Sequence, residues 1–203
     1  SFMMSRELMQ ILLDADEGVE YAVPDDPITA ELLEDGSFLA RAVEICNRNS
    51  TNLNVMKLLK ILRDSWVWVP CNAVMSDNDY AALERLVKAA EAGEGLDSLI
   101  GQNLTMQDET RMIPDILQKG DEFFFPVFST MEAMGDYGND FSKIQKHFFE
   151  CMALARNNEK KVKGIVINAF TTPFVIPMDL FDLAESLESN LKEVTTDERC
   201  KNE

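Results

Sequence analysis

Apolar residues recur three and four positions apart through the first third of the chain, which is the spacing of amphipathic helices. The apolar groups lie within residues 8–12, 28–33, 39–46 and 56–62, and polar or proline-containing breaks separate them. Pro27 suits the first turn of the second segment, and Thr51 or Asn52 suits the cap of the fourth. Residues 1–64 are therefore predicted to form a helical layer.

At Ser65 the pattern changes from helix to strand. Trp66-Val67-Trp68-Val69 is β-branched and aromatic, and Pro70 is predicted to close this strand. Ser76, with Asp79 three residues later, is typical of a capping box and predicts a helix that continues to Gly93. Residues 95–108 are polar and contain glycine, so we expect a connecting loop there.

The second half alternates strands and helices. Residues 111–117 and 122–128 predict a hairpin that turns at Gly120. Because Pro114 cannot donate to a ladder, the first strand should lie at a sheet edge or carry a bulge. Residues 141–155 have one apolar helical face, which Asp140 could cap. Residues 164–168 and 174–176 predict a second hairpin, and Pro177 is expected to begin a terminal helix that reaches residue 191.

The predicted fold class is α+β (mixed α/β). We expect a mixed sheet of about five strands with two hairpins, covered by helices and preceded by the helical layer. The expected divisions are an acidic helical extension at residues 1–26, one α+β domain at 27–194, and a polar tail at 195–203.

From Asn54 to Leu187 the order of these elements resembles the N-terminal domain of the SseB family, bacterial cytoplasmic proteins named for an enhanced-serine-sensitivity phenotype. Two segments carry most of the resemblance: the strand end Pro126-Val127-Phe128-Ser129, and the strand Gly164-Ile165-Val166-Ile167-Asn168. Neither motif is catalytic, so the resemblance implies a fold and a cytoplasmic protein rather than a reaction.

Charge excludes several classes of partner. The 203 residues include 19 Lys+Arg and 36 Asp+Glu, which gives a net charge of −17. Phosphate contacts need clustered basic residues, so we expect no nucleic-acid partner, and the same sign disfavours anionic membranes. No apolar run approaches the roughly 20 residues that span a bilayer. The four cysteines form no CxxC pair, so reduced thiols in the cytoplasm are expected.

Few residues could support catalysis. His147 is the only histidine, and Cys151 lies four positions later, which could pair an imidazole with a nucleophilic thiol. The alternative is an inert core thiol, because Cys151 shares the apolar face of its predicted helix. The acid pairs Asp77/Asp79 and Asp179/Asp182 lie at predicted helix starts, where the helix dipole explains them. No metal-ligand spacing or phosphate-binding glycine loop occurs, so we expect no catalytic residue, no metal and no cofactor.

Five aromatic residues are candidates for a binding groove. Trp66 and Trp68 alternate along one strand and share a face, which could be core beneath a helix or the wall of a groove for a peptide or small ligand. Tyr137, Phe170 and Phe174, near predicted strand ends, could extend that wall.

We therefore expect a non-enzymatic domain that binds another protein, with a homo-oligomer also possible, through the strand ends or the edge at residues 111–117. The alternatives are a sensor of a small molecule, an amino acid or a sulfur metabolite, and an enzyme that uses a thiol or carboxylates.

Overall fold

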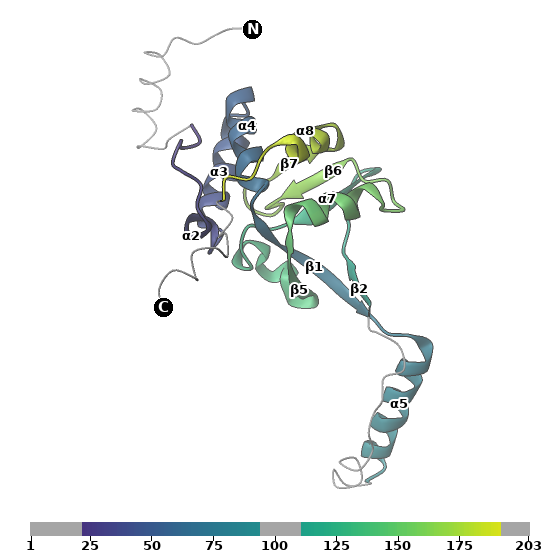
Figure 1. The fold of residues 1–203 in the computed structure, drawn as a ribbon. Helices are drawn as coiled ribbons and strands as arrows, with labels where there is room; N and C mark the ends of the chain where they lie inside the picture. Colours follow the sequence, from purple (N-terminus) through teal and green to yellow (C-terminus); the bar gives the residue numbers. More distant parts are fainter. Residues whose placement is uncertain (1–21, 94–110, 192–203) are drawn as a thin grey trace, which may run out of the picture. The chain divides into compact units, whose positions relative to one another are not determined.

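The computed structural model describes residues 22–93 and 111–191, and Figure 1 shows their helices and strands. The chain divides into two compact units. The larger unit comprises Ser1–Pro70 and Ile116–Glu203, and the smaller unit is Cys71–Asp115.

Three helices begin the larger unit: α2 (Ala30–Leu33), α3 (Ser37–Arg48) and α4 (Asn52–Leu62). Helix α2 begins after Thr29, which caps it, so Pro27 precedes the helix instead of lying in its first turn. Thr51 caps α4 as predicted. The apolar faces of α3 and α4 pack against each other and are buried. The predicted helix at residues 8–12 lies outside the described residues.

The chain just before α2 is tied to α4. Val23 is buried, and its N–H donates to the Asn54 side chain over 3.1 Å. Lys57 donates to the Val23 carbonyl at 3.0 Å and pairs with Asp25 at 2.9 Å. The last residues of the predicted extension therefore pack on the core, while residues 1–21 are not described.

A four-stranded sheet forms the core of the larger unit. Its strands are β3 (Leu117–Lys119), β4 (Glu122–Val127), β6 (Gly164–Ile167) and β7 (Phe174–Pro177), in the order β3-β4-β6-β7. The predicted hairpin of β6 and β7 is present, whereas the first hairpin is formed by β3 and β4 and does not include residues 111–114. The parallel pairing of β4 with β6 joins the two hairpins. Helix α7 (Phe148–Arg156) packs against β4 and β6, and α3 packs against β7, so helices cover the sheet as predicted.

A second sheet makes the strand count seven rather than five. Its order is β2-β1-β5, with β1 at Trp66–Val74, β2 at Arg111–Pro114 and β5 at Ser142–His147. Strand β1 continues past Pro70, because its later residues pair with β2. The single strand predicted at 111–117 is consequently two strands, β2 paired with β1 and β3 paired with β4.

Two predicted helices differ from the structure. Residues 141–155 form β5 followed by α7, since the pairing with β1 overrides the helical spacing of the first residues. The terminal helix is shorter than predicted: a 3₁₀ turn, η2 (Met178–Leu180), precedes α8 (Phe181–Ser186). A further 3₁₀ segment, η1 (Glu132–Asp140), follows Thr130, whose hydroxyl accepts the Ala133 N–H at 3.2 Å.

The smaller unit contains part of β1, β2 and helix α5 (Asp77–Glu91). Ser76 caps α5 as predicted, with its hydroxyl accepting the Asp79 N–H at 3.1 Å. Of the described residues in this unit, only Cys71 and Asp79 are buried. The predicted loop at 95–108 and the predicted tail at 195–203 lie outside the described residues.

Candidate functional site

Strand β1 buries one face and exposes much of the other. Val67 and Val69 are fully buried, whereas Trp66 is 56% exposed and Trp68 is half-buried. The alternation along β1 therefore assigns the valines to the core. Trp66 is not a core residue, because more than half of its surface is exposed.

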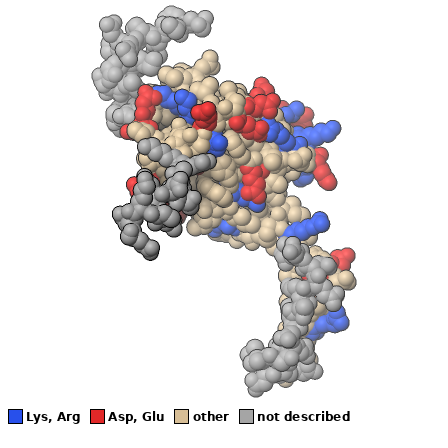
Figure 2. Space-filling model, viewed as in Figure 1, with Lys and Arg blue, Asp and Glu red and all other residues tan. Residues whose placement is uncertain are grey.

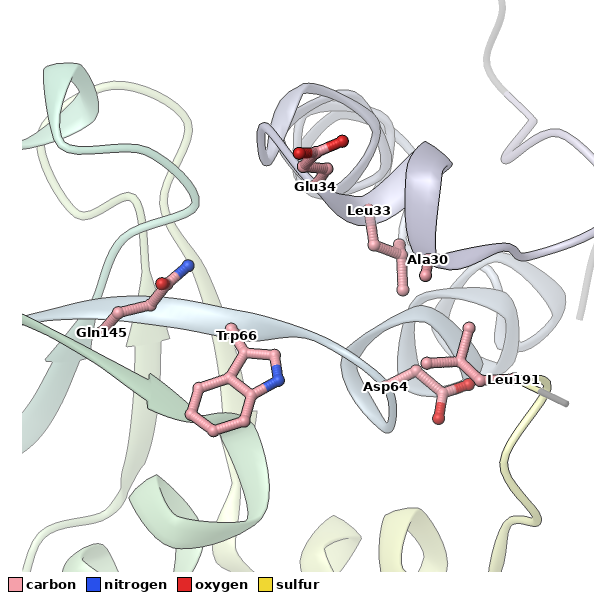
Figure 3. Close-up of a pocket in the computed structure, with 7 residues that line it drawn as sticks. All are labelled: Ala30, Leu33, Glu34, Asp64, Trp66, Gln145 and Leu191. Carbon is pink, nitrogen blue, oxygen red and sulfur yellow. The ribbon is translucent and has the colours of Figure 1, made fainter. Parts of the chain in front are cut away.

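Trp66 lines a pocket of about 490 Å³, which we call the Trp66 pocket (Figure 3). One side of it comes from α2 and the residue after that helix, and the other from β1 and β5. The lining residues are Ala30, Leu33, Glu34, Asp64, Trp66, Gln145 and Leu191. Trp66 is the one predicted groove residue among them.

The two carboxylates of the pocket differ in their surroundings. The Asp64 side chain is buried and accepts three hydrogen bonds: from the Ser189 hydroxyl at 2.6 Å, from the Asn190 N–H at 2.8 Å and from the Asn190 amide at 3.1 Å. Arg63 lies 3.8 Å from the same carboxylate. Asp64 therefore holds the end of the described chain against the end of α4. Glu34 is exposed and forms no ion pair within the described residues.

His147 packs beside Trp66 in an edge-to-face contact, with 5.6 Å between the ring centroids. Its Nδ1 accepts the Phe149 N–H at 3.1 Å and thereby caps α7. Burial, with the charge of Arg63 second, lowers the pKa of His147 from its usual 6.5. The capping bond requires an unprotonated Nδ1, so both effects favour the neutral imidazole.

The residues weighed for catalysis have structural contacts. Cys151 is fully buried in α7. Asp77 and Asp79 lie in the first turn of α5, where negative charge stabilises the helix, and Asp182 pairs with Arg156 at 2.9 Å. Within residues 22–93 and 111–191, no three His, Cys, Asp or Glu side chains cluster as metal ligands would.

Tyr137 and Phe170 belong to a second aromatic group, apart from Trp66. The Tyr137 ring lies 4.7 Å from Phe141 and 4.8 Å from Phe170, which also stacks on Phe128 at 6.0 Å. Phe170 is 52% exposed. The five predicted groove residues are thus not assembled into one aromatic wall among the described residues, since Trp68 and Phe174 join neither group by a ring contact.

The ends of the parallel strands are joined by side chains that follow β4 and β6. Asn168 is buried in the left-handed region at φ 51°, and its Oδ1 accepts the Ser129 N–H at 3.0 Å. Its Nδ2 donates to the Ser129 hydroxyl at 2.9 Å. Ser129 and Asn168 end the two segments that resemble the SseB family, so those segments meet at one point of the fold.

A family model described as SseB protein N-terminal domain matches residues 39–180. The chain belongs to the SseB family. Neither a curated protein nor a solved structure matches the chain. The SseB match includes Asp64, Trp66 and Gln145, but Ala30, Leu33, Glu34 and Leu191 lie outside it. The Trp66 pocket is therefore formed where the SseB domain contacts the segments that flank it in this chain.

Sequence reasoning missed the polar residues of this pocket. Glu34 and Gln145 lie in segments with no motif, and 111 positions separate them. Asp64 offered a weak signal, because it lies in the short connection between a buried helix and a strand. Within the described residues, no helix has the length and apolar character that a bilayer crossing requires.

Proposed function

We propose that this SseB-family chain is a non-enzymatic interaction module that binds another protein through its smaller unit, Cys71–Asp115. The observation that supports this most is the exposure of apolar side chains in that unit. A cytoplasmic location is part of the proposal and rests on the sequence argument given above.

Exposed large apolar residues concentrate in the smaller unit. Five of its described residues are between 36% and 62% exposed: Val74, Tyr80, Val87, Met112 and Ile113. Contiguous exposed apolar surface on a folded protein often marks a contact site. In the ribbon formed by β1 and β2, residues 72–74 and 111–113 are exposed, and a two-stranded ribbon gains little stability by itself.

The register between β1 and β2 brings two of these exposed apolar side chains together. Ile113 lies opposite Asn72, and Arg111 lies opposite Val74. Since alternate residues of a strand share a face, Val74 and Ile113 are diagonal neighbours on one face. They offer a small apolar patch with Arg111 beside it.

The backbone of β2 adds a second mode of contact. Strand β2 is the outer strand in the order β2-β1-β5, as Pro114 predicted. An edge strand can pair with an extended segment of a partner, where backbone hydrogen bonds give affinity and neighbouring side chains give specificity. We expect a partner that adds a strand here and covers Val74 and Ile113.

Charge favours a basic protein as the partner. The net charge of the chain is −17. On the face shown in Figure 2, Lys and Arg are interspersed with Asp and Glu over the larger unit and form no separate basic patch. Electrostatic complementarity accelerates association with partners of the opposite sign.

The test compares two variants in quantitative capture from native cytoplasm. The double variant Val74→Thr/Ile113→Thr keeps β-branched residues in the ribbon but removes the apolar patch. The control Leu53→Gln removes a residue that is 63% exposed on α4 of the larger unit. We expect one partner to be captured reproducibly by the wild type and the control and to be lost with the double variant. Equal capture by all three proteins, or no reproducible partner, would contradict the proposal.

A second candidate function is small-molecule sensing, and the Trp66 pocket favours it. Its volume of about 490 Å³ is within the range of ligand pockets, and an exposed indole, an amide and two carboxylates line it. Thermal stabilisation of the full chain by a compound from a metabolite panel would support this role. No stabilisation by the panel, or equal stabilisation of Trp66→Leu, would argue against it.

A further inference from the structure

We propose that the Trp66 pocket binds a small organic cation, an ammonium or guanidinium compound with alkyl substituents. This inference rests on the second candidate function and is independent of the protein-interaction proposal. Three properties of the lining support it: the sign of its charge, the exposed indole and the apolar wall.

Both charged residues in the lining, Glu34 and Asp64, are acidic. Arg63 and the hydrogen bonds from Ser189 and Asn190 offset much of the Asp64 charge. Glu34 therefore remains as the carboxylate that a ligand can approach from solvent. A cation gains from this field, whereas the carboxylate of a free amino acid is repelled by it, so a zwitterion fits the pocket less well.

The indole of Trp66 supplies a second attraction for a cation. Tryptophan has the strongest cation–π interaction of the aromatic side chains, and quaternary ammonium groups are recognised in this way. The ring is 56% exposed, so a ligand can reach it. Its neighbour His147 is kept neutral by the capping bond to Phe149, so the imidazole places no positive charge beside the site.

The remaining walls are apolar or neutral. Ala30, Leu33 and Leu191 provide alkyl surface, and Gln145 provides an amide. Figure 3 shows Ala30 and Leu33 on the α2 side of the pocket and Trp66 and Gln145 on the strand side. Methyl or methylene groups around a cationic nitrogen would be buried against this surface, which adds affinity without another polar partner.

Glu34 and Leu191 lie outside the residues that match the SseB domain. The exposed carboxylate therefore comes from a segment that flanks the SseB domain, whereas the Trp66 indole comes from within the domain. Removing the charge of Glu34 tests this directly, because Glu34 is exposed and its replacement by Gln leaves the core intact.

The binding test uses the full chain and three compounds of similar shape: choline, its neutral isostere 3,3-dimethylbutan-1-ol, and the zwitterion glycine betaine. Isothermal titration and tryptophan fluorescence report binding. We expect choline to bind saturably and the other two compounds to bind more weakly. If the neutral isostere binds as tightly as choline, small-molecule binding stands but the cation inference is overturned. If no compound binds saturably, the cation inference is overturned, whereas small-molecule sensing is judged separately by the metabolite panel.

Variants locate the site and measure its parts. Trp66→Leu is expected to weaken choline binding about threefold to thirtyfold, and Glu34→Gln about twofold to fivefold. The matched controls are Phe170→Leu, an exposed aromatic outside the pocket, and Glu31→Gln, an exposed carboxylate on α2 outside the lining. Both controls should bind like the wild type. Choline affinity unchanged in Trp66→Leu would place binding elsewhere and overturn the inference.

One further compound separates two sources of the same chemistry. N-acetyl-lysine amide presents an ammonium as a protein side chain does. Weaker affinity than that of choline would support a free small cation as the occupant. Affinity equal to that of choline would overturn that assignment in favour of a basic side chain of another protein.

Discussion

Replacing Asn168 by alanine should destabilise the larger unit through two separable effects. Asn168 joins the ends of β4 and β6, with its Oδ1 accepting the Ser129 N–H at 3.0 Å and the Ser129 hydroxyl at 3.2 Å. Both residues are buried, at 2% exposure each. The Asn168 backbone is also left-handed, at φ 51°, which asparagine tolerates better than alanine does.

The magnitude follows from these contacts. Asn168→Ala leaves the buried Ser129 N–H without its acceptor, at a cost of about 1–3 kcal/mol. Alanine in the left-handed conformation adds about 1–2 kcal/mol. The expected loss in free energy of unfolding is therefore about 2–5 kcal/mol. Asn168→Gly loses the same hydrogen bonds without the backbone strain, so it should be more stable than Asn168→Ala by about 1 kcal/mol.

Urea unfolding followed by circular dichroism measures these differences. The midpoint should fall for both Asn168 variants with the m-value unchanged. The control is Asn157→Ala, since exposed Asn157 donates one hydrogen bond, to the Ala153 carbonyl at 3.0 Å. A loss below about 1 kcal/mol for Asn168→Ala would refute the claim that the bridge stabilises the strand ends. Equal losses for the alanine and glycine variants would refute the contribution of backbone strain.

Three further predictions concern single residues. Gly36→Ala should lower the free energy of unfolding by more than about 3 kcal/mol, because Gly36 is at φ 77° and an added Cβ would lie 2.0 Å from the Ser129 carbonyl oxygen. Gly120→Ala is the control in the same urea assay. Gly120 is at φ 64° with open space around it, so this variant should lose only about 1–2 kcal/mol. The free energy of unfolding should fall as pH drops below 6.5, because His147 is protonated near pH 6.5 in the unfolded chain and only at lower pH in the folded chain. Urea midpoints measured between pH 7.5 and 5.5 should show this decrease. The variant His147→Asn should lack the part of the decrease that His147 causes. Burial raises the pKa of Cys46 to about 11, so this thiol should react with a thiol reagent only after unfolding. Rapid labelling at Cys46 itself in the native protein, located by peptide mass spectrometry, would contradict its burial.

Local spacing predicted most elements of this fold. The capping residues Thr51 and Ser76 begin helices where expected, and Gly120 turns the hairpin of β3 and β4. Pro114 lies on an outer strand, as its missing N–H requires. These predictions hold because a helix cap, a tight turn and the missing N–H of a proline are each determined by a few neighbouring residues.

Predictions failed where a distant segment decides the conformation. The residues of β5 have apolar spacing that also fits a helix, and their pairing with β1 makes them a strand. Strand β1 continues beyond Pro70 for the same reason, because β2 pairs with its later residues. Sheet pairing joins residues far apart in the chain, so its energy is not visible in any short window.

The alternation at Trp66–Val69 determined which side chains share a face of β1, and the net charge of −17 follows from the composition alone. Only the tertiary structure decided that the Trp66 side chain is exposed, and that Glu34, Gln145 and Leu191 line a pocket together with it. Likewise, Ser129 and Asn168 could each be assigned to a strand end, but their hydrogen bonds required the parallel pairing of β4 with β6. The physical reason is the same in both cases: periodicity is a property of the local backbone, whereas a cavity or a bridge exists only after folding brings distant side chains within a few ångströms.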